Sequence, residues 1–271
     1  MLRDGQTGDW IGTFIGHKGA VWQARLSSDG NLAATGSADF SAKVWDTHTG
    51  ECLSTLQHNH IVRAVAFPGG EARILATGGQ EKKLRIFDLS RSVSAAADPS
   101  SAGAAGGLTN GTSSSSDPPS YEIGPGIHGG TIKSIVWSTD LNILTTASDD
   151  KKVRWWDLRT RSPICDYTVD GLIGSCEFNE SPGDSSSGTG VLSVAAGKAV
   201  YFFDGAKPGS LIKSVATPYD IASVALHADQ RKFVTGTAGD TWVRVWDFDE
   251  EKEIGERSYL LASSHWPYSR A

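Results

Sequence analysis

Near the N-terminus, the side chains of His17, Thr35 and Asp39 are of the types that carry out acyl transfer. In a nucleophilic triad, a histidine takes the proton of an attacking hydroxyl group while a carboxylate orients the imidazole ring. The same side chains can also form a structural hydrogen-bonded chain, to which Trp45 would add an N–H donor. A catalytic set occurs once, whereas a structural set can repeat with the fold.

The set does repeat, as His128, Thr146, Asp150 and Trp156. Because an enzyme needs one active site rather than one per repeat, we predict that both sets are structural and that the chain is not an enzyme. Each hydrogen bond would contribute about 0.5–1.5 kcal/mol net, and more where the aspartate is charged. Replacing Asp39 by asparagine is therefore expected to lower the unfolding midpoint.

These residues belong to a unit that recurs along the chain and ends in aspartate, at Asp46, Asp88, Asp157, Asp204 and Asp247. The spacings of 42, 69, 47 and 43 residues indicate a period in the low forties. Together with alternating apolar residues and turn signals, this period is typical of the four-stranded blades of an all-β propeller. In the unit that begins at Gly16, strands are expected at 21–26, 32–37, 41–45 and 51–56.

Within one propeller domain at 1–256 we predict five complete blades, at about 16–56, 58–124, 128–169, 171–215 and 217–256. An insertion at 91–120, rich in Ser, Ala and Gly, explains the long second spacing. We expect it to be disordered because it cannot bury enough apolar area to offset its ordering entropy. A similar loop lies at 181–190, on the same predicted rim, and 257–271 is expected to be an irregular tail.

Leu2–Gly8 aligns without gaps on Val44–Gly50, so the chain is expected to begin in the third strand of a partial blade. We therefore expect a fragment or a divergent gene model, whose ring is not closed by the usual interlock of N- and C-terminal strands. Two sheet edges would then be open to pairing.

The 271-residue chain carries a net charge of −6, which argues against a nucleic-acid binder that works by bulk charge, and no DNA partner is expected. Its three cysteines match no metal or redox spacing, and Walker or zinc motifs are absent, so no metal or cofactor is predicted. The sequence shows no signal peptide and no apolar run near the roughly 20 residues that span a bilayer. We expect a soluble protein of the cytoplasm and nucleus, without a membrane partner.

Two successive tight turns carry basic residues that would form an interaction patch on the short-loop rim: Lys82, Lys83, Arg85, Lys151, Lys152 and Arg154. The alternative is a pair of solvated turns without a partner. Among the nine tryptophans, Trp22 and Trp137 are assigned to equivalent first-strand positions, so we expect them in the core rather than in a base-stacking platform.

The recurring Gly-His and Trp-Asp pairs resemble those of the WD-repeat β-propellers. More narrowly, Met1 to about Gly255 resembles the serine-threonine kinase receptor-associated protein family, also described as unr-interacting protein. The runs that carry this resemblance are TGDWIGTFIGHKGAVWQARL, ATGSADFSAKVWD, HNHIVRAVAF, TGGQEKKLRIFDL and DDKKVRWWD. The resemblance implies a seven-bladed scaffold without catalysis. In animals, the family is associated with TGF-β receptor signalling and with the survival-of-motor-neuron complex, which assembles spliceosomal ribonucleoproteins.

The insertion at 91–120 resembles fungal versions of the family, and the absence of TGF-β receptors in fungi favours the ribonucleoprotein role. The resemblance thus implies protein partners in a multi-subunit ribonucleoprotein-assembly complex, with indirect RNA association. One alternative is a translation-initiation scaffold, because subunit i of eukaryotic translation initiation factor 3 shares the GH-x-GAVW start. A receptor-kinase-associated signalling adaptor is another. A propeller hydrolase would require a unique cluster of polar or metal-binding residues, and the sequence shows none.

Overall fold

The computed structural model describes residues 1–70, 72–90, 118–180, 190–227, 229, 231–237, 239 and 242–258, with side chains up to residue 254. These residues form 22 β-strands in antiparallel sheets, five of four strands and one of two. None of them belongs to a helix long and apolar enough to cross a membrane. The predicted all-β class, with four-stranded blades and a partial N-terminal blade, is confirmed.

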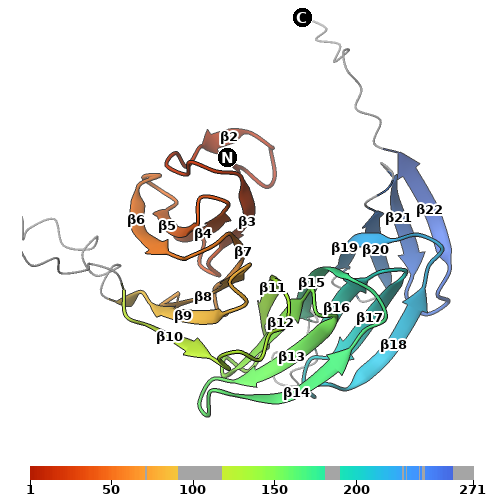
Figure 1. Ribbon diagram of the computed structural model, residues 1–271. Coiled ribbons are helices and arrows are strands. Elements are labelled where there is room, and N and C mark those ends of the chain that lie inside the picture. Colours follow the sequence, from red (N-terminus) through yellow and green to blue (C-terminus); the bar gives the residue numbers. More distant parts are fainter. Residues whose placement is uncertain are drawn as a thin grey trace, which may run out of the picture. The chain divides into compact units, whose positions relative to one another are not determined.

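The chain divides into two compact units, Met1–Asp166 and Tyr167–Ala271, with the boundary near the end of β14 (Ser162–Thr168), which is described with the first unit. In the first unit, a two-stranded sheet pairs β1 (Leu2–Arg3) with β2 (Trp10–Gly12). Three four-stranded sheets follow it in chain order (Figure 1). Their strands are β3 (Val21–Leu26), β4 (Leu32–Ser37), β5 (Ser41–Asp46) and β6 (Cys52–Gln57); β7 (Val62–Ala66), β8 (Ile74–Gly79), β9 (Leu84–Asp88) and β10 (Ser120–Ile123); and β11 (Ile132–Trp137), β12 (Ile143–Ser148), β13 (Lys152–Asp157) and β14 (Ser162–Thr168).

The second unit contains two further four-stranded sheets of the same up-and-down order. Their strands are β15 (Ile173–Glu180), β16 (Gly190–Ala196), β17 (Ala199–Asp204) and β18 (Leu211–Ala216), followed by β19 (Ile221–Leu226), β20 (Lys232–Thr237), β21 (Trp242–Asp247) and β22 (Glu253–Ser258). Each strand pairs with the next one along the chain, so no long crossover is needed within a sheet.

In the β3–β6 sheet, the aspartate that ends the repeat closes the turn between the third and fourth strands. Asp46 Oδ1 accepts the backbone N–H groups of His48 and Thr49, at 2.7 and 3.0 Å. Gly50 ends the turn at φ +76°, a conformation that glycine adopts without steric cost. These hydrogen bonds, with that of Thr49 the strongest influence, keep the pKa of Asp46 below its ordinary value. The recurrent aspartate therefore has a structural role in the turn.

The N-terminal hairpin contains the same turn. Asp4 Oδ1 accepts the N–H groups of Gln6 and Thr7, both at 2.8 Å, and Gly8 has a φ of +76°. The segment before β2 thus has the geometry of a third-to-fourth-strand turn, as its alignment with Val44–Gly50 predicts.

Apolar faces of successive sheets pack on each other within the first unit. Val62, Val65 and Phe67, from and just after β7, lie in one core cluster with Leu32 and Val44 of the preceding sheet. A second cluster joins the β7–β10 sheet to the β11–β14 sheet in the same way. In the second unit, one cluster joins the β15–β18 and β19–β22 sheets. The first strands of the β7–β10, β11–β14 and β19–β22 sheets are thus buried by the sheet that precedes each of them.

The predicted irregular segments differ from the structure at their ends. Residues 91–117, 181–189 and 259–271 lie outside the described residues, so the proposed disorder of the insertion stays a prediction. Ser120 begins β10, Gly190 begins β16, and Arg257 and Ser258 end β22. The strands therefore extend into the segments predicted to be irregular, because backbone pairing with the neighbouring strand continues to those residues.

Candidate interaction site and buried polar clusters

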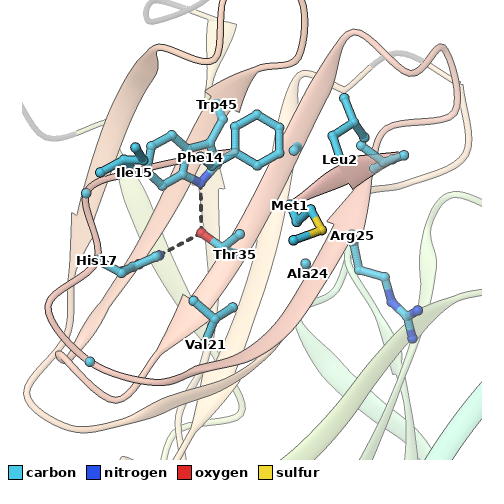
Figure 2. A pocket seen from close by; sticks show the side chains of 14 residues that line it. Met1, Leu2, Phe14, Ile15, His17, Val21, Ala24, Arg25, Thr35 and Trp45 are labelled. Carbon is cyan, nitrogen blue, oxygen red and sulfur yellow. Dashed lines mark hydrogen bonds between the residues drawn. The ribbon is translucent and has the colours of Figure 1, made fainter. Parts of the chain in front are cut away.

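A cavity of about 500 Å³ lies where the N-terminal segment meets the β3–β6 sheet. Figure 2 shows Met1 and Leu2 from the start of the chain, Phe14 from the segment that leads to β3, and Val21 from β3. Most of its walls are apolar, and His17 and Thr35 contribute polar groups. The cavity can therefore accept an apolar group from a partner.

The cavity exists because the leading face of the β3–β6 sheet is exposed. Val21 and Leu26 are 50% and 52% exposed. Their counterparts in the β7–β10 sheet, Val62 and Phe67, are 1% and 9% exposed because they pack on the preceding sheet. The same strand pattern thus gives a buried face where a four-stranded sheet precedes it and an open one at β3.

The register of the first strands also corrects the prediction for Trp22. Val21 pairs with Ser37 and Ile132 pairs with Ser148, so Trp22 corresponds to the residue after Ile132 rather than to Trp137. Trp137 is 7% exposed and belongs to the core, but Trp22 is 50% exposed. The expectation that Trp22 lies in the core is wrong, because side chains alternate between the two faces of a strand.

The first polar cluster consists of His17, Thr35, Asp39 and Trp45, which the structure brings together in one chain of hydrogen bonds. His17 Nδ1 lies 2.8 Å from Asp39 Oδ2, and His17 Nε2 lies 2.7 Å from Thr35 Oγ1. The Trp45 indole N–H donates to Thr35 Oγ1 at 2.8 Å. With His17 neutral and protonated at Nδ1, the Thr35 hydroxyl donates to Nε2, and every donor has an acceptor.

Asp39 is the acceptor at the end of this chain. Burial opposes its ionisation, but hydrogen bonds from the Ser41 hydroxyl, the Lys18 N–H and His17 outweigh that effect and hold the pKa of Asp39 far below its ordinary value. The Ser41 N–H also donates to Asp39, at 3.1 Å. Asp39 therefore ties together the loop before β3, β4 and the start of β5.

The second polar cluster, in the β7–β10 sheet, has Glu81 and Phe87 where the first has Asp39 and Trp45. Glu81 forms a 2.7 Å ion pair with Arg85 and lies 3.8 Å from His58. Burial, and then the charge of Arg85, lower the pKa of His58 to about 4, although Glu81 acts in the opposite direction. His58 is consequently neutral at pH 7.

The third polar cluster differs from the prediction that His128, Thr146, Asp150 and Trp156 form one linked set. Trp156 Nε1 donates to Thr146 Oγ1 at 2.8 Å, as in the first cluster. Asp150, however, accepts two hydrogen bonds from Arg154, at 2.7 and 3.1 Å, instead of one from His128. Arg154 also donates to His128 Nδ1 at 3.2 Å.

The guanidinium of Arg154 thus lies between the histidine and the aspartate. His128 Nε2 is buried and, within the described part of the chain, has no hydrogen-bond partner. Burial, followed by the charge of Arg154, lowers the pKa of His128 to about 4, with Asp150 acting in the opposite direction. The predicted linked set is therefore replaced by two pairs, Thr146–Trp156 and Arg154–Asp150.

Arg154 also corrects the predicted basic patch. It is 5% exposed and paired with Asp150, so it offers no charge to a partner. The other members differ in exposure and pairing. Arg85 pairs with Glu81, Lys83 with Glu122 at 3.2 Å and Lys152 with Asp166, whereas Lys82 and Lys151 are exposed at the tips of their turns. The surface charge of these two turns is therefore smaller than the sequence suggested.

The sequence did not reveal that an arginine two positions before the last aromatic residue of the third strand would have a partly or fully buried side chain. Arg85 and Arg154 occupy this position in successive sheets, and Arg244 occupies it in the β19–β22 sheet. Arg244 is 3% exposed, and its guanidinium carbon lies 3.7 Å from the centroid of the Tyr219 ring. In the same sheet Trp246 donates to Thr235 at 2.9 Å. The sequence signal is an acidic residue four positions before each arginine, as Glu81 precedes Arg85, Asp150 precedes Arg154 and Asp240 precedes Arg244.

The chemistry of the first cluster is that of a structural network, although its distances match those of a triad. Thr35 is 5% exposed and its oxygen accepts the Trp45 N–H, which lowers its nucleophilicity. The Trp-to-Thr bond recurs in the third cluster and in the β19–β22 sheet. Within the described ranges, no group of three or more His, Cys, Asp or Glu side chains is arranged to hold a metal ion.

Comparison with known proteins agrees with this architecture. The family described as "WD domain, G-beta repeat" matches residues 8–46, 50–88, 126–157 and 209–247. Repeated four-stranded sheets, closing Trp-Asp turns and this match define the class of the molecule, a WD-repeat β-propeller protein. Proteins of this class bind other proteins and generally act as non-catalytic scaffolds.

Similarity to named proteins extends along nearly the whole chain. "Serine-threonine kinase receptor-associated protein" of Dictyostelium discoideum is 36% identical over 255 residues, which cover 94% of this chain and 74% of the relative. Its counterpart of Gallus gallus is 38% identical over 254 residues, covering 94% of this chain and 62% of the relative. The chain belongs to the serine-threonine kinase receptor-associated protein family. It spans less than two thirds of the chicken relative and about three quarters of the Dictyostelium one.

A second, shorter similarity involves an initiation factor. "Eukaryotic translation initiation factor 3 subunit I" of Debaryomyces hansenii is 38% identical over 86 residues, which cover 30% of this chain and 25% of that protein.

Proposed function

We propose that this chain is a protein-interaction scaffold that takes part in spliceosomal ribonucleoprotein assembly as a component or partner of a complex of the survival-of-motor-neuron type. The observation that carries the proposal is the 36–38% identity, over 94% of the chain, to serine-threonine kinase receptor-associated proteins. We further propose that the chain works in the cytoplasm and nucleus, and that any association with RNA passes through its protein partners.

The geometry supports a scaffold rather than a catalyst. The polar clusters of the β3–β6, β7–β10 and β11–β14 sheets tie turns to strands, which holds the short turns of one rim in fixed positions for a partner. The apolar cavity beside β3 and the exposed short turns are two surfaces that the described residues offer for recognition.

Two alternatives have a specific observation behind them. The name of these relatives favours an adaptor associated with a serine-threonine kinase receptor. The 86-residue similarity favours an initiation-factor scaffold, but it covers less than a third of the chain. The longer similarity therefore supports a role like that of the serine-threonine kinase receptor-associated proteins more strongly than a role as an initiation-factor scaffold.

The test is affinity purification of the tagged full chain from nuclease-treated cell extract, followed by quantitative mass spectrometry. An unrelated WD-repeat protein with the same tag serves as the control bait. The proposal expects enrichment of ribonucleoprotein-assembly subunits that survives nuclease treatment. Recovery of initiation-factor subunits or receptor kinases, without assembly subunits, would contradict it.

A further inference from the structure

Two side-chain pairs in the first unit combine exposed aromatic surface with positive charge. These pairs, Trp22 with Arg63 and Phe40 with His60, together form what we call the aromatic-basic cluster. Trp22 is 50% exposed and Phe40 is 43% exposed. The Arg63 guanidinium carbon lies 4.2 Å from the centroid of the Trp22 ring, and the Phe40 and His60 rings are 5.2 Å apart.

Backbone hydrogen bonds hold the cluster on the rim of the short turns. Ala38 N–H donates to Ala20 O at 2.8 Å, which fastens the Phe40 turn to the loop that leads into β3. His58 N–H donates to Phe40 O at 2.9 Å, which fastens the same turn to the loop that leads into β7. The aromatic side chains therefore project from a rigid framework, and binding to them would cost little ordering entropy.

The backbone at Phe40 is unusual for a bulky residue. Its φ is +65°, in the left-handed region, where a residue with a side chain is disfavoured by about 1–2 kcal/mol. Lys82 and Lys151 occupy the corresponding positions of the next two sheets, with φ of +62° and +64°. Three successive sheets thus keep a residue with a side chain in this conformation, and Phe40 does so at a conformational cost.

The charges around the cluster indicate which partner fits it. Lys82 is exposed, and its turn is joined to the His60 loop by the hydrogen bond from Gln80 N–H to Ile61 O, at 3.0 Å. Arg63 and Lys82 therefore add positive charge next to apolar rings. This combination attracts carboxylates and also offers apolar contact area.

We propose that the aromatic-basic cluster, extended by Lys82, is a docking surface for an acidic peptide segment of a partner protein that also carries an apolar side chain. A nucleic acid fits less well, because Arg63 covers one face of the Trp22 ring and leaves less of that ring for base stacking.

The surface can be tested with synthetic probes on the isolated chain. Fluorescence anisotropy would follow a fluorescein-labelled peptide of alternating glutamate and leucine, with a lysine-leucine peptide and an oligouridylate as comparisons. Phe40→Gly removes the ring and relieves the left-handed strain, and Arg63→Glu reverses the charge. Lys232→Glu, at an exposed position of β20, makes the same charge change elsewhere. Circular dichroism and thermal unfolding identify any variant that fails to fold, in which case Phe40→Asn replaces Phe40→Gly.

The acidic peptide is expected to bind saturably and more weakly as salt rises. Phe40→Gly and Arg63→Glu should each weaken binding by about tenfold or more, equivalent to about 1.4 kcal/mol, and Lys232→Glu should have little effect. Absence of saturable binding, or equal loss in all three variants, would overturn the proposal. Preferential binding of oligouridylate that the same two variants weaken would assign the surface to nucleic acid instead. Because purified chain and synthetic probes are used, this outcome is independent of which cellular complex the protein joins.

Discussion

Replacing Asp39 by asparagine should destabilise the first unit measurably. The two carboxylate oxygens accept four hydrogen bonds, from His17, the Lys18 N–H, and the N–H and hydroxyl of Ser41. Asparagine keeps one acceptor oxygen, so its NH₂ group must face two donors in either orientation. The Asp39 side chain is 13% exposed, and water therefore replaces the lost acceptor poorly.

The magnitude follows from these contacts. Hydrogen bonds to a charged group are each worth about 1.5–3 kcal/mol, and a change of His17 tautomer recovers part of the loss. We expect the free energy of unfolding to fall by about 2 kcal/mol. For a unit of this size, that loss corresponds to a melting temperature lower by about 4–8 °C.

The assay is urea and thermal unfolding followed by tryptophan fluorescence, with hydrogen exchange of the peptides around β4 and β5 as a local readout. Asp9→Asn makes the same charge change at an exposed position of the same unit and serves as the control. If Asp39→Asn and Asp9→Asn unfold at the same midpoint, and exchange around β4 is unchanged, the structural role of the first polar cluster is refuted.

Three further outcomes are expected. Arg154→Met should lower the free energy of unfolding in urea by about 3 kcal/mol, because it leaves the partly buried Asp150 carboxylate without a partner. Arg159→Met, at a 66% exposed side chain, should have little effect. Equal effects of the two substitutions would contradict the buried ion pair. His128 has a pKa of about 4 when folded and 6.5 in the reference state, so the unfolded chain binds more protons below pH 6.5. Stability should fall from pH 6.5 toward pH 4, and less in His128→Gln; an unchanged pH profile in that variant would count against the assignment. Thr235→Val should cost about 1–3 kcal/mol by leaving the Trp246 N–H unpaired, and Thr235→Ser should restore stability in the same thermal assay if the hydroxyl is what matters.

Local sequence signals were sufficient to predict the strands of a blade. β3 occupies 21–26 and β4 occupies 32–37, the ranges expected from alternation and from the turn at Asp29-Gly30. The hairpin before β2 was also predictable, because Asp4 and Gly8 repeat the turn chemistry of Asp46 and Gly50. Turns of this kind are set by the residues within them.

Side-chain environments were less predictable than strands. In the sequence, Lys-Lys-x-Arg predicts an exposed basic turn. In the structure, the position of Arg154 in its strand directs its side chain toward Asp150 and away from solvent. Trp22 was assigned to the core because it was placed at a first-strand position equivalent to that of Trp137. The bulge after Val21 instead puts Trp22 at the position of Arg63 and Lys133, which are only partly buried. Both environments depend on strand register rather than on residue type.

The scaffold proposal is tested most directly by crosslinking mass spectrometry on the affinity-purified native assembly. The predicted result is a set of crosslinks from Lys82 and its neighbour Lys83 to an acidic segment of a ribonucleoprotein-assembly subunit, retained after nuclease treatment. Crosslinks confined to initiation-factor or receptor-kinase subunits, or an assembly in which the chain contacts no other protein, would contradict the proposal.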